Sequence, residues 1–169
     1  TLFLKALGYS PQEILDYFYE RETFILKDGN RFLKITPYHL LLGQKAPADI
    51  VDDKTEEVLV KKHKKITHAV IKRMEALNIT AIPVEEEDVI GKITAREIRD
   101  PETGKVLLPL NKEITKEDIE LLRSRRVEGF EVLFIDNLNV SPSLRNTLLE
   151  DKAQTKEEAL LEIYRKLRP

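Results

Sequence analysis

The sequence predicts an α+β fold in which duplicated β-β-α-β modules and an N-terminal β-hairpin are flanked by short helices. Three observations lead to this prediction. Helix-start signals stand near both ends, a hairpin pattern follows the first of them, and residues 49–84 align without gaps with residues 97–132. The chain has 169 residues, of which 41% are hydrophobic and 34% charged. This composition is typical of a globular protein that is long enough to bury a core.

The first expected helix follows Ser10. Ser10, Pro11 and Glu13 form the pattern of a capping box with proline in the first helical turn. An apolar stripe should then face the protein, and it consists of Ile14, Leu15, Tyr17 and Phe18.

A β-hairpin is expected next. The strand-like segments 23–26 and 31–35 flank Asp28-Gly29-Asn30, whose residues tolerate a positive φ. Thr36 and Pro37 then open a short helical turn through Leu42, which Gly43 ends.

An internal repeat organises the middle of the chain at a constant offset of 48 residues. Each copy should contain two short strands joined by an Asp-led turn, a corner at His63 or Asn111, a helix capped by Thr67 or Thr115, and a closing strand. The expected strands include 58–60 and 79–84 in the first copy, and 106–108 and 130–135 in the second. Ten of the 36 aligned pairs are identical, and their members in the first copy are Ile50, Asp52, Thr55, Val58, Leu59, Lys64, Ile66, Thr67, Ile71 and Val84.

A last helix is expected after Thr155, where Thr155 and Glu158 form a second capping-box pattern. Its last turn carries basic residues, and Pro169 ends it. The apolar face of so short a helix needs a partner. The apolar residues are Leu160, Leu161, Ile163, Tyr164 and Leu167, and the basic ones are Arg165, Lys166 and Arg168.

The overall charge and the absence of cysteine exclude several functions. There are 28 basic and 30 acidic residues, so the formal net charge is −2, which is unfavourable for a free-standing nucleic-acid binder. Without cysteine there can be no disulfide, thiolate metal site or cysteine nucleophile. No apolar run approaches the ~20 residues that a membrane span needs, so we expect no membrane association.

Two charged runs are candidates for chemistry. Glu85-Glu86-Glu87-Asp88 could hold a divalent cation, as in a small metal-dependent hydrolase, but the favoured interpretation is a solvated linker. The run from Lys61 to Lys65 could contact phosphate, but no aromatic residue is interleaved to stack a base. We therefore favour a solvated corner there as well.

The remaining polar candidates match no known catalytic pattern. The histidines lack the i, i+4 spacing of helical metal sites, the serines lie in expected caps or loops, and the three arginines complement a helix dipole. We predict no catalytic, cofactor-binding or metal-binding residue in this chain. The residues concerned are His39, His63 and His68, then Ser10, Ser124, Ser141 and Ser143, and finally Arg123, Arg125 and Arg126.

The two ends resemble a known family. The segments 4–10, 12–15, 144–148 and 155–169 are similar to stretches of the β subunit of bacterial DNA-directed RNA polymerase. The resemblance implies that residues 1–20 and 141–169 are segments of the β lobe, also called the second β domain. Residues 21–140 would then be a lineage-specific insertion. Because the two end segments are close neighbours in relatives without the insertion, the resemblance implies that residues 10–18 and 156–167 pack together. Related insertions often carry glycine at the repeat corner, where this chain has His63 and Asn111.

The resemblance also implies a function. The chain would be a non-catalytic fragment in DNA-templated transcription, because the catalytic Mg²⁺ of the family is bound by another subunit. The implied partners are the β′, α, ω and σ subunits, downstream DNA near the lobe, and regulatory proteins that dock on the insertion as a scaffold. The implied location is the cytoplasm, close to the nucleoid. The alternative is a stand-alone protein-interaction module unrelated to polymerase.

Overall fold

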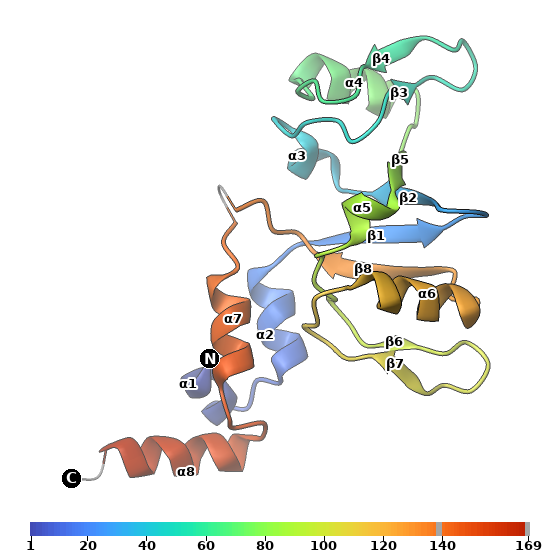
Figure 1. The fold of residues 1–169 in the computed structure, drawn as a ribbon. Helices are drawn as coiled ribbons and strands as arrows, with labels where there is room; N and C mark the ends of the chain where they lie inside the picture. The colour runs from blue at the N-terminus through green and yellow to red at the C-terminus, as the bar shows by residue number, and fades with distance from the viewer. Residues whose placement is uncertain (138–139, 168–169) are drawn as a thin grey trace.

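A four-stranded antiparallel sheet forms the centre of the computed structural model, which describes residues 1–137 and 140–167 (Figure 1). The strand order is β5-β2-β1-β8, with β1 spanning Arg21–Leu26, β2 Arg31–Ile35, β5 Ala81–Glu85 and β8 Gly129–Leu133. The hairpin β1–β2 is therefore confirmed, and Gly29 lies in its turn with a φ of 71°. The α+β class is confirmed too.

Each outer strand closes one of two similar segments. Copy one (residues 38–85) runs from β2 to β5, and copy two (residues 86–133) runs from β5 to β8. Every element of copy two begins and ends 48 residues after its equivalent in copy one. The elements of copy one are α3 (Tyr38–Leu41), β3 (Ile50–Val51), β4 (Val58–Val60), α4 (His68–Ala76) and β5. Those of copy two are α5 (Glu86–Val89), β6 (Ile98–Arg99), β7 (Val106–Leu108), α6 (Lys116–Ser124) and β8.

Two expectations for this region are wrong. The acidic run is not a linker, because Glu85 caps α5, whose first turn contains the other three acids. Asp88 Oδ2 in turn accepts a hydrogen bond from the Glu85 N–H at 3.0 Å, and acidic groups are favourable at a helix N-terminus. The closing strands also differ from the expected segments, because β5 spans Ala81–Glu85 rather than 79–84 and β8 spans Gly129–Leu133 rather than 130–135.

The same local chemistry shapes both copies. Thr67 Oγ1 accepts a hydrogen bond from Val70 N–H at 3.4 Å, and Thr115 Oγ1 accepts one from Asp118 N–H at 3.3 Å. These are the caps that the sequence predicts for α4 and α6. At the corners, His63 and Asn111 have φ values of 68° and 60°. Both corners therefore adopt a left-handed conformation, which glycine enters at no steric cost and other residues enter less readily.

The two copies contribute unequally to the core. Copy two packs α6 and its strands on the sheet, where Leu122 joins Phe24, Phe32 and Phe130 in one buried cluster. Copy one forms a separate cluster around Met74, and from the sheet only Ile82 of β5 belongs to it. Copy one thus projects from the sheet with a small core of its own (Figure 1).

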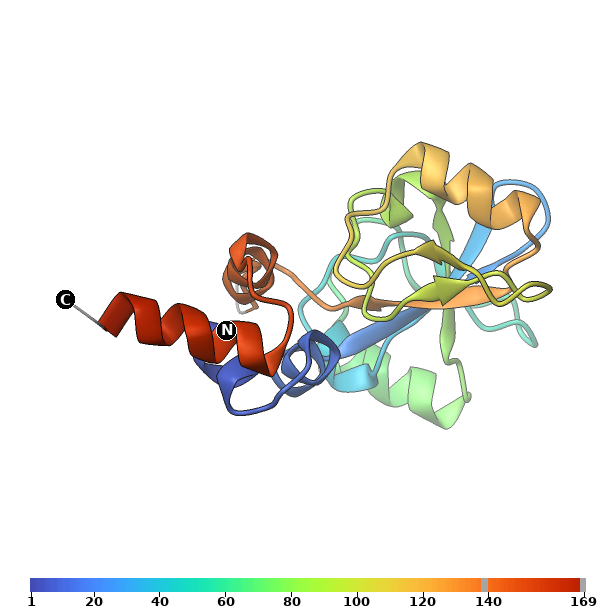
Figure 2. The same cartoon turned by 90° about the horizontal axis from the view of Figure 1, so that it is seen from below.

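Four helices form a group at one end of the sheet, and α2 and α7 of this group pack on copy two (Figures 1 and 2). They are α1 (Leu2–Ala6), α2 (Pro11–Phe18), α7 (Ser143–Glu150) and α8 (Lys156–Leu167). The predicted capping box of α2 is confirmed, and Ile14 and Leu15 are buried. The predicted stripe is wrong in its other half, because Tyr17 and Phe18 are 82% and 51% exposed. The next aromatic, Tyr19, is the buried one.

The partner expected for the last helix is also wrong. Helix α8 packs against α1, where Ala6, Ala153 and Ala159 allow a close approach. Helix α7 occupies the place beside α2, with Leu148 in the same cluster as Ile14. Most of the predicted apolar face of α8 is exposed, namely Leu160, Leu161, Tyr164 and Leu167.

The capping box predicted for α8 forms in part. Thr155 Oγ1 accepts a hydrogen bond from Glu158 N–H at 3.2 Å, but the Glu158 carboxylate accepts one from Gln154 N–H instead of from Thr155. Arg168 and Pro169 lie outside the described residues. Among the helices of the described residues, none has the length and apolar character of a bilayer span.

Candidate functional site

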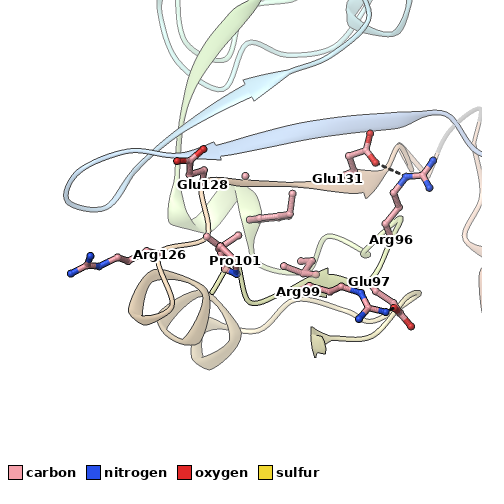
Figure 3. Close-up of a pocket in the computed structure, with 11 residues that line it drawn as sticks. Arg96, Glu97, Arg99, Pro101, Arg126, Glu128 and Glu131 are labelled. Carbon is pink, nitrogen blue, oxygen red and sulfur yellow. Dashed lines mark hydrogen bonds and ion pairs between the residues drawn. The ribbon is translucent and has the colours of Figure 1, made fainter. Parts of the chain in front are cut away.

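A charged groove of about 570 Å³ lies between β8 and the segment that leads into β6 (Figure 3). Arg96 Nε donates to Glu131 at 2.7 Å, and an Arg99 guanidinium N–H donates to Glu97 at 2.8 Å. Arg126 points away from these pairs (Figure 3). The lining contains no hydroxyl, thiol, imidazole or amine side chain, so the groove can bind charged groups but offers no nucleophile of these four kinds.

A buried charge cluster joins the hairpin to copy two. Glu22 is 2% exposed, and its Oε1 accepts hydrogen bonds from Lys34 Nζ at 3.0 Å and from Thr36 Oγ1 at 2.9 Å. Lys92 lies close by, and burial lowers its pKa, while the charge of Glu22 acts in the opposite direction. Glu22, Lys34 and Thr36 are all buried, and the two charged groups are paired, as buried charges require.

Copy two is fixed to the terminal helices through its corner. Arg145 of α7 donates from Nε to Asn111 Oδ1 at 2.8 Å and from Nη2 to the Asn111 carbonyl at 2.9 Å. Burial lowers the pKa of Arg145, while the charge of Glu113 acts to raise it. Apolar residues of the same corner pack with α2 and α7. We call Ile93, Ala95, Leu110 and Asn111 the docked corner.

Polar contacts extend this attachment along α2. Gln12 Nε2 donates to the Ala95 carbonyl at 2.8 Å, and Asp16 lies 3.7 Å from Arg96 and 3.4 Å from Arg21. Arg96 and Arg21 also approach Glu131, at 2.7 and 3.9 Å. The groove of Figure 3 is thus bounded on one side by a network that holds copy two to α2.

The basic run lies on the equivalent corner of copy one. Lys45, Pro47, Lys62 and His63 precede the docked-corner residues by 48 positions, and we call them the free corner. They line a cavity of about 490 Å³. The whole run 61–65 is exposed, as predicted for a solvated corner.

The other candidates from the sequence have structural roles. His39 Nε2 lies 2.8 Å from the Glu20 carboxylate, whereas His63 and His68 lie on either side of the start of α4. Ser10 caps α2, and Ser124 Oγ donates to Leu121 O at 2.7 Å. Ser141 and Ser143 bond to each other at 2.6 Å. Within residues 1–137 and 140–167 there is no group of three acids, histidines or cysteines that could hold a metal.

The arginines of α6 do more than complement the helix dipole. The Arg123 guanidinium lies 4.7 Å from the centre of the Phe32 ring and donates to Lys27 O at 3.1 Å. Arg125 lies 3.7 Å from Asp100, which is buried in the preceding turn. These contacts hold α6 against the hairpin and against its own module.

Sequence reasoning missed the polar groups that fix the terminal helices. Lys5 is 2% exposed and donates to the Ala153 carbonyl at 2.6 Å, with Asp151 at 3.7 Å. The sequence predicts Asn111 only as a corner residue, and its partner Arg145 stands out only as part of the segment 144–148. The one usable signal was the difference between Asn111 and His63 at equivalent positions.

Comparison with known proteins gives one consistent result. The chain is 46% identical over 169 residues to the DNA-directed RNA polymerase subunit beta of Sorangium cellulosum, 45% over 183 aligned positions to that of an Anaeromyxobacter species, and 43% to that of Myxococcus xanthus. Each alignment covers 100% of this chain and 12% to 13% of the relative. No family model matches the chain. Because its terminal helices and both copies align with these subunits from end to end, the chain belongs to the β-subunit family of DNA-directed RNA polymerase, of which it corresponds to one segment.

Proposed function

We propose that the chain serves DNA-templated transcription as a non-catalytic part of a polymerase β subunit. In this proposal the terminal helices belong to the lobe of the subunit, and the sheet with its two copies forms a scaffold on which regulatory proteins dock. The observation that carries the proposal is the identity of 43% to 46% to β subunits over the whole chain. The β′, α, ω and σ subunits and downstream DNA are the proposed neighbours.

The way in which strands β1 and β8 join the terminal helices supports the division into a lobe and an inserted block. Strands β1 and β8 pair antiparallel, with Arg21 opposite Leu133, so the block of residues 21–133 leaves and re-enters the helical part at one place. Beyond the strands, Tyr19 Oη donates to Ser141 O at 2.8 Å. A block attached through neighbouring ends can be carried by a lobe without separating its helices.

Removing the projecting part of copy one, up to the start of β5, from an assembled polymerase tests the proposal. Ile35 and Ala81 are paired across β2 and β5, so residues 37–80 can be replaced by a four-residue Asn-Gly turn that leaves the sheet and copy two in place. We expect promoter-independent elongation to stay within about twofold of the intact enzyme, because a docking platform makes no transition-state contact. The response to a regulatory protein of the same organism should change. Loss of elongation by a correctly assembled enzyme would refute the non-catalytic assignment.

The alternative of a free-standing interaction module makes a different prediction. Such a module would act without the other subunits, so the isolated chain would bind its target and polymerase would be absent from the complex. Co-purification of the tagged, chromosomally encoded chain with β′ in constant proportion is the expected result under the proposal. Recovery of the chain without any polymerase subunit would favour the alternative.

A further inference from the structure

The free corner and the docked corner have the same backbone. His63 N–H donates to Ala46 O at 2.8 Å, and Asn111 N–H donates to Thr94 O at 3.0 Å. The bridge between Lys45 and Lys65 likewise repeats between Ile93 and Glu113. One of the two corners already holds protein helices, so the shape that the other presents is one that can receive a protein segment.

The side chains of the two corners differ in charge. Lys45 stands where the docked corner has Ile93, Lys62 where it has Leu110, and Lys65 where copy two has Glu113. All three lysines are exposed. None of them has an ion pair within 4 Å among the residues that the structure describes. An apolar helix such as α7 would leave these ammonium groups desolvated and unpaired, which is unfavourable.

The helices that follow the two corners, α4 and α6, also differ in charge. Helix α4 has no acidic residue in its first turn, whereas α6 has Glu117 and Asp118, the latter paired with Lys112. The acids that line the cavity of the free corner are Glu85, Glu87 and Asp88. Two of them, Glu85 and Asp88, are occupied in the capping box of α5. Because no acidic residue stands in the first turn of α4, the positive N-terminal end of this helix adds to the positive charge of the lysines.

We infer that the free corner docks an acidic protein segment in the way that the docked corner holds α7. The inference rests on the proposed function and names the surface and the chemistry of the partner. A protein is favoured over nucleic acid because the equivalent corner binds a helix. In addition, no phenylalanine, tyrosine or tryptophan lines the cavity to stack a base.

Binding of a decaglutamate peptide to the 169-residue chain tests the inference, with a decaglutamine peptide as the uncharged comparison. Two-dimensional amide NMR should show shifts at residues 45 and 61–68, and decaglutamate should bind at least about tenfold more tightly than decaglutamine. The double variant Lys62→Glu/Lys65→Glu should weaken binding about tenfold or more. The matched control is Lys105→Glu/Lys116→Glu, which makes the same charge change on exposed lysines of copy two and should stay within twofold.

Three outcomes would overturn the inference. Equal binding of the two peptides would exclude charge recognition, and shifts centred outside the free corner would place the site elsewhere. A ten-base-pair DNA duplex that binds more tightly than decaglutamate, and is lost in the Lys62→Glu/Lys65→Glu variant, would assign the corner to nucleic acid. The milder pair Lys62→Gln/Lys65→Gln, with circular dichroism as the check of folding, guards against a loss of binding through misfolding.

Failure here is separable from failure of the proposed function. If decaglutamate does not bind but the polymerase without residues 37–80 elongates normally and responds differently to a regulator, the docking role stands and only the acidic partner is refuted. If elongation is lost, the proposed function fails whatever the peptide does.

Discussion

Copy one and copy two have the same elements in the same register, yet they are held by different forces. Copy two shares its core with the central sheet through Leu122 and is tied to α7 by hydrogen bonds between Arg145 and Asn111. Copy one has the separate cluster around Met74 and an exposed corner at His63. A repeated unit can therefore serve as a structural anchor in one place and as a projecting surface in another, while its helices and strands keep the same register.

The largest effect should come from the equivalent core residues Met74 and Leu122, which are both fully buried. Replacing either by alanine leaves a cavity and should cost about 3 kcal/mol. We expect Leu122→Ala to lower the free energy of global unfolding, because its cluster includes the sheet. Met74→Ala should instead increase amide exchange only within residues 38–80. Native-state hydrogen exchange monitored by NMR distinguishes the two, and the same global loss in both variants would show that the copies unfold together.

The next effect concerns the attachment of copy two. Arg145→Ala removes two hydrogen bonds from a charged group to Asn111 and leaves the buried Asn111 Oδ1 without its guanidinium donor, so it should cost about 2 kcal/mol in urea unfolding. Arg165→Ala in α8 is the matched control, because this arginine is exposed. Equal losses in both variants would contradict the role assigned to the docked corner.

The sequence predicts correctly the features that depend on partners close by in the chain. The hairpin turn and the caps at Ser10, Thr67 and Thr115 were predicted because their partners lie within a few residues. The helix α5 was missed because four acidic residues carry no apolar periodicity. Its equivalence to α3, which has no similar sequence, is visible only in the backbone.

The errors at the ends have the same origin. An apolar face predicts burial but does not name its partner. The pairing of α8 with α2 came from the neighbouring ends that the family resemblance implies, whereas α8 packs on α1. The bonds between Asn111 and Arg145 join residues 34 apart in sequence. No local pattern predicts such a pair, and the candidate docking surface therefore became visible only through comparison of the two corners.

The Asp-led turns should respond to acid in the same way in both copies. Backbone N–H groups hold the pKa of Asp52 and of Asp100 below the usual value, with Lys54 and Glu102 as the main donors. A carboxyl group whose pKa is lowered by folding stabilises the folded state at pH values above its pKa in the unfolded chain, which is about 3.9. This stabilisation is lost as the pH falls through the pKa of the folded state. Asp52→Asn and Asp100→Asn should each flatten the decline of stability below about pH 4.

Urea unfolding at several pH values between 2 and 7 measures this decline. Asp53→Asn is the control, because Asp53 is the exposed neighbour of Asp52. The two turn variants should agree, since neither turn takes part in the attachment of copy two to α7. A much larger effect at Asp100 would mean that its neighbour Arg125, 3.7 Å away, couples the turn to α6.

The smallest expected effect is a gain at the free corner. His63 has a φ of 68°, a conformation that asparagine adopts more readily than histidine, and Asn111 has it at the equivalent position with a φ of 60°. His63→Asn should therefore stabilise copy one against local unfolding by about 0.5 kcal/mol, which is measured as slower amide exchange. The reciprocal Asn111→His should destabilise the chain, because an imidazole cannot replace both amide contacts to Arg145. If His63→Asn instead destabilised copy one, the imidazole would have a packing role, and the free corner would differ from the docked corner in more than its charge.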